Sequence, residues 1–176
     1  MPSSFSNLDK VFWDKSENRP KLTKKDLIEY YNKISEYLLP YLRDRPLSSS
    51  RYPNGIQGKH FYHNRDKEKP DFAQSANIYS KSKEGIINYI ICNNKDTLLW
   101  LANLGCLEMH HWYSRVNELH AYENKTVDQE KCGLNTPDFM VFDLDPYIYS
   151  GKEKKGRMNQ YTTSMHLKLQ LMLHIA

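Results

Sequence analysis

The sequence predicts an α+β domain in which helices pack on a mainly antiparallel sheet. Three observations predict it: an amphipathic helical pattern near the start of the chain, several β-branched and aromatic runs of strand length, and a short helical segment between two of those runs. The chain has 176 residues, of which 39% are hydrophobic, enough for one folded domain with a core.

The first element is an amphipathic helix over about residues 24–39. Thr23 and Asp26 form an N-cap and a variant capping box, because a side chain three residues into a helix can accept a bond from the cap backbone. Pro40 and Pro46 are expected to close the segment. The apolar positions that recur at helical spacing are Leu27, Tyr31, Ile34 and Leu38.

The later elements follow from composition and turn signals. A polar asparagine-rich turn separates a β-branched run from a short helix, and Gly105 is expected to end that helix. The expected elements are, in order, a turn over 51–55, a strand over 85–92, a helix over 97–103, a strand over 107–112, a polar loop over 114–136 and a strand over 139–142.

Charge and cysteine content indicate the kind of partner and the compartment to expect. The formal net charge is +4, and residues 1–70 carry 14 Lys and Arg against 9 Asp and Glu. This bias favours a polyanion near the amino-terminal half, although a solvated surface accounts for it nearly as well. Three scattered cysteines do not make a disulfide framework, and with no leader or membrane-spanning run the chain is expected in the cytoplasm.

Two aspartates after the last expected strand are candidate metal ligands. Asp143 and Asp145 are two residues apart, so in an extended strand they share a face with Cα atoms roughly 6.5 to 7 Å apart. Met140 and Phe142 then take the opposite face, toward a core. Paired carboxylates suit Mg²⁺ or Mn²⁺, although two solvated acids at a strand end would give the same pattern.

Several motifs occur together in a recognisable order, and they carry a family resemblance. The chain resembles the polymerase domain of bacterial ligase D and its stand-alone archaeal relatives, which belong to the archaeo-eukaryotic primase superfamily and serve end joining. The stretches that match are 7–11 (NLDKV), 23–31 (TKKDLIEYY), 43–47 (RDRPL), 51–56 (RYPNGI), 98–105 (LLWLANLG), 108–110 (EMH) and 137–146 (PDFMVFDLDP).

The resemblance implies roles for individual residues. Lys10 and Lys24 match positions that hold the 5′-phosphate of a DNA end, and Lys24 lies where a helix start would add its amide dipoles. Arg51 lies in a nucleic-acid-contacting loop, but the residue before it, often lysine in relatives, is Ser50. The remaining matches are an aromatic pair that stacks on template or incoming bases, Phe61 and Tyr62, and a histidine close to the nucleotide phosphates, His110.

The same resemblance implies an activity and partners. In the family, two metal ions bound by Asp143, Asp145 and a third aspartate would support transfer of a nucleotide from a nucleoside triphosphate to a primer 3′ end. The implied cofactor is Mn²⁺ or Mg²⁺, and the implied partners are DNA ends with a 5′-phosphate, nucleoside triphosphates, a DNA ligase and a Ku-like end-binding protein.

The carboxy-terminal tail departs from the family pattern. Residues 147–176 contain neither the Ser-Gly-Gly-x-Gly-x-His segment nor the third aspartate expected after the Asp-x-Asp strand. We therefore divide the chain into residues 1–146, the amino-terminal part of a primase-polymerase-like domain, and a divergent tail over 147–176. We interpret the tail as a truncated or shifted reading frame or as a short paralogue, and two functions stay open: nucleotide addition at breaks, or non-catalytic binding of 5′-phosphorylated DNA ends.

Overall fold

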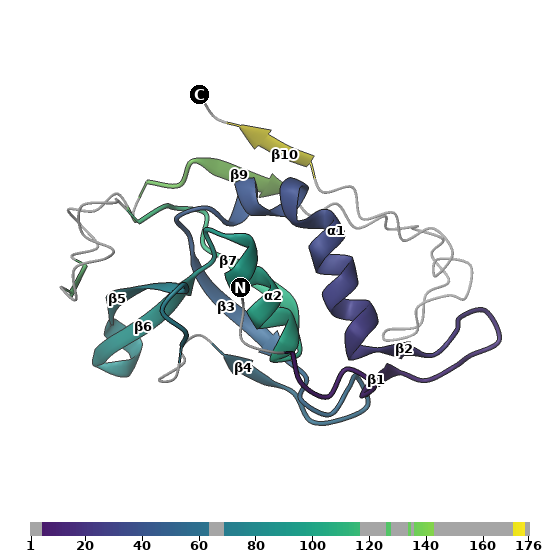
Figure 1. Ribbon diagram of the computed structural model, residues 1–176. Coiled ribbons are helices and arrows are strands. Elements are labelled where there is room, and N and C mark those ends of the chain that lie inside the picture. The colour runs from purple at the N-terminus through teal and green to yellow at the C-terminus, as the bar shows by residue number, and fades with distance from the viewer. Residues whose placement is uncertain are drawn as a thin grey trace, which may run out of the picture. The chain divides into compact units, whose positions relative to one another are not determined.

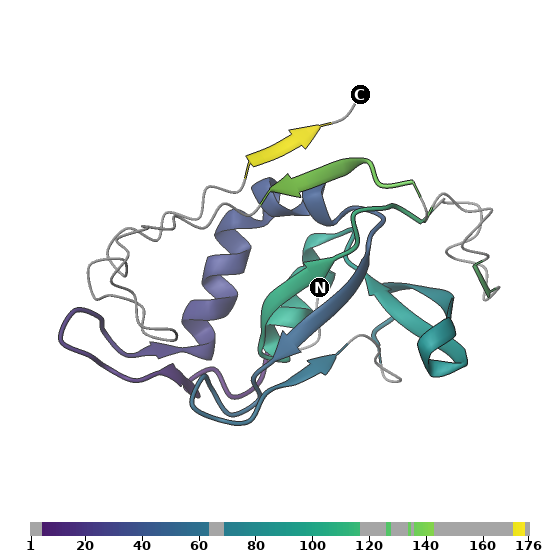
Figure 2. The same cartoon turned by 180° about the vertical axis from the view of Figure 1, so that it is seen from behind.

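A computed structural model describes residues 5–63, 69–116, 126–127, 134, 136–142 and 171–174. The chain forms two compact units, Met1–Pro137 and Asp138–Ala176. The helices and strands of the first unit (Figures 1 and 2) are, in chain order, β1 (Val11–Trp13), β2 (Leu22–Thr23), α1 (Lys24–Leu42), β3 (Pro46–Arg51), β4 (Phe61–His63), β5 (Gln74–Ser80), β6 (Gly85–Ile91), α2 (Lys95–Asn103), β7 (Cys106–His111) and β8 (Thr126–Val127), with a 3₁₀ turn at Lys81–Lys83 between β5 and β6.

β3 is the central strand of the main sheet. β7 pairs antiparallel with β3 between Leu47 and Arg51. The other edge of β3 pairs first with β6, at Pro46 and Leu47, and then with β4, from Ser49 to Arg51. β5 continues the sheet beyond β6 through an antiparallel ladder, and the short β8 is its parallel neighbour. The α+β class and the mainly antiparallel sheet predicted from the sequence are confirmed.

α1 begins at the predicted cap. The Thr23 amide and hydroxyl both donate to Asp26 Oδ2, at 2.6 and 2.7 Å. The predicted end at residue 39 is wrong, because α1 continues through Pro40 to Leu42. A proline this near the carboxyl end removes only one helical donor, and the Arg43 amide still donates to Leu39 O at 3.0 Å. Continuation also buries Leu42, which is 1% exposed.

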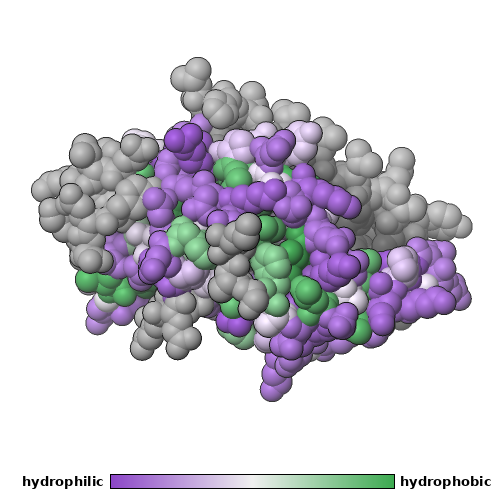
Figure 3. Space-filling model, in the orientation of Figure 1, coloured by the Kyte–Doolittle hydropathy of each residue, from purple (hydrophilic) through white to green (hydrophobic). Residues whose placement is uncertain are grey.

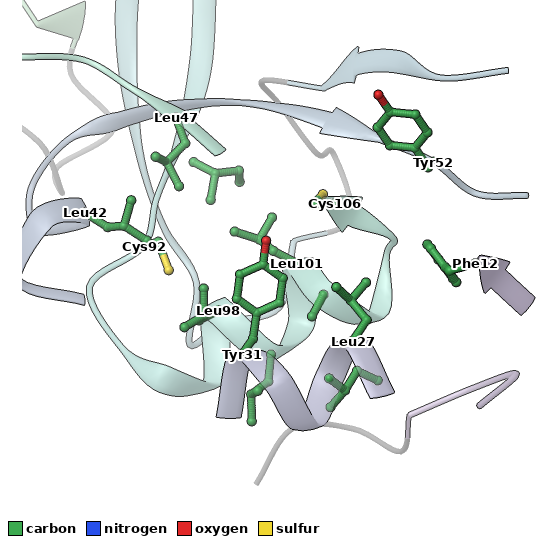
Figure 4. Close-up of a cluster of buried hydrophobic side chains, with 14 residues drawn as sticks. Phe12, Leu27, Tyr31, Leu42, Leu47, Tyr52, Cys92, Leu98, Leu101 and Cys106 are labelled. Carbon is green, nitrogen blue, oxygen red and sulfur yellow. The ribbon is translucent and has the colours of Figure 1, made fainter. Parts of the chain in front are cut away.

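α1 and α2 cover one face of β3 and β7, and the main core lies between these helices and the sheet (Figures 1, 2 and 4). Figure 4 shows side chains from α1, α2 and the sheet pointing into this space. Tyr31 of α1 reaches across it, because its hydroxyl donates to Leu107 O at 2.9 Å, and burial raises the pKa of that hydroxyl. The labelled members of the cluster are Phe12, Leu27, Tyr31, Leu42, Leu47, Tyr52, Cys92, Leu98, Leu101 and Cys106.

A β-bulge in β7 sets which side chains face away from the helices. Ser50 pairs with Glu108, but the next residue, Arg51, pairs with Cys106, so Leu107 is the extra residue. Cys106 is therefore buried in the core, whereas Glu108 and His110 lie on the opposite face of the sheet. No helix of the first unit, as far as its residues are described, covers that face (Figure 2).

The remaining predictions agree with the structure to within two residues or differ for local reasons. α2 begins at Lys95 rather than 97, because Asn94 caps it by accepting from the Thr97 amide at 2.8 Å. Gly105, at φ 81°, follows the helix as predicted, and a Cβ there would lie 2.9 Å from Tyr52 O. β6 and β7 were predicted, whereas β1 to β5 were not, and β8 lies within the predicted loop.

The second unit contains the predicted strand after Pro137. β9 (Phe139–Phe142) pairs antiparallel with β10 (Leu171–His174), with Phe142 opposite Leu171. The expectation that Met140 anchors this strand in a core is wrong, since its side chain is 49% exposed. A two-stranded ribbon has too little apolar surface to bury both faces of its strands.

Candidate nucleic-acid interface

Three cationic side chains from separate segments converge beside the start of α1. Lys10 precedes β1, Lys24 is the first residue of α1, and Arg51 ends β3. The backbone fixes this meeting, because the Lys24 amide donates to Lys10 O at 2.8 Å and the Lys25 amide to Leu8 O at 3.0 Å. We call Lys10, Lys24 and Arg51 the cationic cluster.

The lysines of the cationic cluster are held by backbone carbonyls rather than by acids. The Lys10 ammonium donates to Pro53 O and the Lys24 ammonium to Ser6 O, each at 2.7 Å. Lys24 is 7% exposed. Burial lowers the pKa of Lys24, and the positive charges of Lys10 and Arg51 lower it further. These ammonium groups therefore lie close enough to repel, an arrangement that an anion would stabilise.

The helix start contributes less to this site than the sequence predicted. The first two amides of α1, on Lys24 and Lys25, are already bonded to the carbonyls of Lys10 and Leu8. Those two donors are not available to a phosphate. What the cluster offers to an anion is therefore mainly its side-chain charges.

A glycine turn places the Arg51 segment against the Lys10 segment. Gly55 has φ 79°, and a Cβ there would lie 2.6 Å from Val11 O. The next amide, of Ile56, donates to Phe12 O at 3.0 Å. A side chain at Gly55 would clash and force the two segments apart, so the glycine of the predicted 51–55 turn has a structural reason.

Arg51 connects the cationic cluster to the aromatic strand β4. Its Nε donates to Leu104 O at 2.8 Å, which fixes the guanidinium, and Cζ lies 5.7 Å from the centre of the Phe61 ring. This distance is typical of a cation–π contact. Phe61 is 46% exposed, so the ring keeps a free surface beside the cationic cluster.

Phe61 and Tyr62 do not form a single stacking platform. They are neighbours in β4, opposite Arg51 and Ser50 of β3, so their side chains point to opposite faces of the sheet. Phe61 lies on the side of Arg51, whereas Tyr62, 70% exposed, lies on the side of His110 with ring centres 6.1 Å apart. The predicted site residues thus fall into two groups joined through β3 and β4.

The second group contains residues that the sequence did not single out. His110 Nε2 lies 3.4 Å from Ser50 Oγ and 3.5 Å from Glu108 Oε2. Glu108 also contacts the Tyr52 hydroxyl: burial raises the pKa of Tyr52, and the charge and hydrogen bond of Glu108 add to that shift. The spacing of Glu108 and His110 in an expected strand could have indicated their shared face.

The predicted metal ligands lie outside the described residues, and this applies to both Asp143 and Asp145. Within the described part of the chain, no group of three or more His, Cys, Asp or Glu side chains is placed to hold a metal ion. The metal site therefore stays a prediction from the sequence. Cys92 and Cys106, two of the three cysteines, are buried free thiols, and burial raises the pKa of Cys92 to about 12.

A large open cleft lies elsewhere, at the carboxyl end of α1. Its volume is about 990 Å³, and Arg43, Asp44 and Asn93 are among the residues that line it. Its polar groups bond to one another, since Asn93 Nδ2 donates to Asp44 Oδ1 at 2.7 Å and to Gln74 Oε1 at 2.8 Å. We assign it no chemistry. On the face seen in Figure 1, hydrophilic residues predominate over the described surface (Figure 3).

Comparison with solved structures defines the class of the domain. The polymerase domain from Mycobacterium tuberculosis ligase D in complex with DNA matches with a TM-score of 0.65 and 27% sequence identity, over 82% of this chain and 46% of that chain. The fold is therefore that of a polymerase-type α+β domain. The family model described as LigD, primase-polymerase domain, matches residues 23–167, and the chain belongs to that family.

Curated relatives are non-homologous end-joining proteins. The chain is 40% identical over 143 residues to the bifunctional non-homologous end joining protein LigD of Bacillus subtilis, covering 81% of this chain and 19% of the relative. It is 29% identical over 142 residues to the multifunctional LigD of Mycolicibacterium smegmatis, covering 80% of this chain and 16% of the relative. The chain thus spans less than a fifth of the length of these relatives.

The extent of the family match differs from the range of the quoted motifs. The family model begins at residue 23, after Lys10, and extends past Pro146 into the tail. The proposed boundary at residues 146 and 147 stays a prediction. Among the described residues, no helix is long and apolar enough to span a membrane.

Proposed function

We propose that this chain binds the ends of broken DNA and holds a terminal 5′-phosphate at the cationic cluster. The observation that carries the proposal is the convergence of Lys10, Lys24 and Arg51. Burial lowers the pKa of Lys24, and the charges of Lys10 and Arg51 lower it further. Like charges brought together, one of them buried, destabilise a protein unless an anion offsets them. A terminal phosphate carries the charge and the acceptor oxygens that three such donors require.

The aromatic side chain next to the cationic cluster suits a base at a DNA end. Phe61 is half exposed, and its ring is held beside the Arg51 guanidinium. Base stacking on such a ring is worth about 1 to 3 kcal/mol and does not depend on the identity of the base. End binding by phosphate and stacking would therefore tolerate any sequence, as the repair of breaks requires.

The second candidate function is addition of nucleotides to primer 3′ ends. It is favoured by the family membership and by the exposed Tyr62 and His110 on the other face of the sheet. Asp143 and Asp145 would hold Mn²⁺ or Mg²⁺, whose chemistry is to stabilise charge on the phosphoryl oxygens. On this face, His110 would contact a nucleotide phosphate and Tyr62 would stack on its base. A DNA ligase and a Ku-like protein would supply the other steps of joining.

Fluorescence anisotropy on paired duplexes tests end binding. The two probes are recessed duplexes of identical sequence, one with and one without a 5′-phosphate at the recessed end. We expect the phosphorylated probe to bind at least about tenfold more tightly, because charge-assisted contacts are worth about 1.5 to 3 kcal/mol each. The preference should weaken as salt rises. Equal affinity for the two probes would reduce the cationic cluster to a general basic surface.

A primer-extension assay with Mn²⁺ separates the two functions. Extension of the recessed 3′ end by the 176-residue chain alone would establish nucleotide addition. End binding without extension would favour the non-catalytic module. A positive control with a complete end-joining polymerase domain excludes a failed assay.

A further inference from the structure

Glu108 contacts several residues on the open face of the sheet, and neither of the two functions proposed above uses it. It lies on the face of the sheet away from the helices, and its side chain is about half exposed. Its carboxylate is 3.5 Å from His110 Nε2 in its own strand, β7. Ser50 of β3 pairs with Glu108 across the ladder and approaches the same imidazole nitrogen at 3.4 Å.

The carboxylate also contacts a second chain segment. Tyr52 follows β3, and burial raises the pKa of its hydroxyl; the charge of Glu108 and a hydrogen-bonding interaction with that carboxylate raise it further. The Tyr52 ring stacks on His60 with centres 4.9 Å apart and planes 20° apart, and His60 contacts Tyr62 edge-on at 6.4 Å. One carboxylate therefore connects the imidazole of β7 with the rings that lead into β4.

We propose that Glu108 is a positioning residue that orients His110 and the Tyr52–His60 stack for nucleotide binding. The nucleotide part rests on the second function proposed above. A carboxylate that lies 3.5 Å from Nε2 can accept a hydrogen bond from that nitrogen and so hold the ring in one orientation. With Nε2 held by Glu108, the other ring nitrogen, Nδ1, is left to contact a nucleotide.

The surroundings of His110 are compatible with this geometry. The described groups around its ring are Ser50 from β3, Glu108 from β7 and Tyr62 from β4. Of these, only Glu108 is a carboxylate. Loss of Glu108 would leave the imidazole with a hydroxyl and a ring face, which hold its orientation less firmly than a carboxylate does.

Tyrosine-labelled NMR measures the contact without any ligand. Tyr52→Phe identifies the Tyr52 signal, and its titration is then followed in Glu108→Ala, Glu108→Gln and the control Glu36→Ala, which removes an exposed acid on α1. We expect Glu108→Ala to lower the pKa of Tyr52, Glu108→Gln to lower it less because the amide oxygen still accepts, and Glu36→Ala to leave it unchanged. An unchanged Tyr52 titration in Glu108→Ala would overturn the proposal.

ATP binding in the presence of Mn²⁺ measures the consequence. Glu108→Ala should weaken ATP binding about tenfold, with partial rescue in Glu108→Gln. If Glu108 acts through His110, the double variant Glu108→Ala/His110→Ala should bind no more weakly than His110→Ala. Additive losses would overturn the proposal. Absence of ATP binding by the unmodified protein would instead contradict the proposed nucleotide site, while the Tyr52 titration would still decide the role of Glu108.

Discussion

Replacing Lys24 with methionine should separate binding from stability. Methionine keeps most of the aliphatic volume of a side chain that is 7% exposed, and it removes the ammonium. The bond from Nζ to Ser6 O, 2.7 Å long, is lost, at a cost of about 1 kcal/mol. The repulsion from Lys10 and Arg51 and the burial of the charge are also lost, and both of these destabilise the folded protein.

The two effects on folding oppose each other, so we expect the free energy of unfolding to change by less than about 1 kcal/mol. No opposing effect of this kind acts on the binding of a phosphorylated DNA end. Loss of one charge-assisted contact should weaken binding to a 5′-phosphorylated end by about 10- to 150-fold. Binding to the unphosphorylated probe should change little, because the lost contact is to the terminal phosphate.

The assay combines urea unfolding with anisotropy on the two matched duplexes. Lys25→Met is the control, since it removes an adjacent exposed ammonium that pairs only loosely with Glu29 at 3.8 Å. A Lys24→Met variant that is several kcal/mol less stable, yet discriminates the phosphorylated end as well as the unmodified protein, would refute the reasoning. Lys24 would then serve only to stabilise the fold through its hydrogen bond to Ser6 O.

Four further outcomes are expected. A bound phosphate raises the lowered pKa of Lys24, so end binding takes up a proton in the alkaline range and the affinity for the DNA end should fall there as pH rises. Lys24→Arg should flatten this dependence of affinity on pH, which anisotropy at several pH values measures. Bonds from the cap backbone and hydroxyl lower the pKa of Asp26, so its contribution to stability is present above the ordinary carboxyl pKa and is lost as pH falls through the lowered one. Asp26→Asn should therefore cost about 1 kcal/mol at neutral pH and little in acid, which unfolding at the two pH values measures. Phe61→Ala should weaken the binding of DNA ends, and Tyr62→Ala should weaken the binding of a nucleotide, each by about 1 to 3 kcal/mol. If both variants lost the same affinity in one of the two assays, the result would contradict their placement on opposite faces of the sheet. Asp143→Ala should abolish Mn²⁺ binding in a spectroscopic titration, and an unchanged titration would remove that residue from the metal site.

The elements predicted correctly are those with local signals. α1 has its cap and its helical spacing, and β6 is a β-branched run beside an asparagine turn. The central strand β3 has no such signal, because Pro46 and three consecutive serines resemble a loop. Two of those serines, Ser49 and Ser50, are 2% and 1% exposed. Only the ladders on both edges of β3 make it a strand, and these depend on residues distant in sequence.

The motifs indicate candidate site residues one at a time, and their roles stay predictions. Lys10, Lys24 and Arg51 were expected to contact nucleic acid, and the structure brings them together. The separation of Phe61 from Tyr62 could not be predicted, because the three residues of β4 are too few to show the alternation that indicates a strand. Glu108 was missed because its importance lies in its contacts across strands.

The extra residue in β7 has a consequence for how this chain can vary in length. Leu107 offsets the alternation of the strand, so that Cys106 enters from the core and Glu108 and His110 leave on the open face. Deleting Leu107 would leave Cys106 opposite Arg51 and Glu108 opposite Ser50, so the acid and the imidazole would keep the open face. The junction follows directly after a helix and looks like a place for insertions and deletions. The bulge can therefore lose its extra residue, whereas a one-residue slip of the ladder would turn the acid and the imidazole toward α1 and α2, where an unpaired charge is costly to bury.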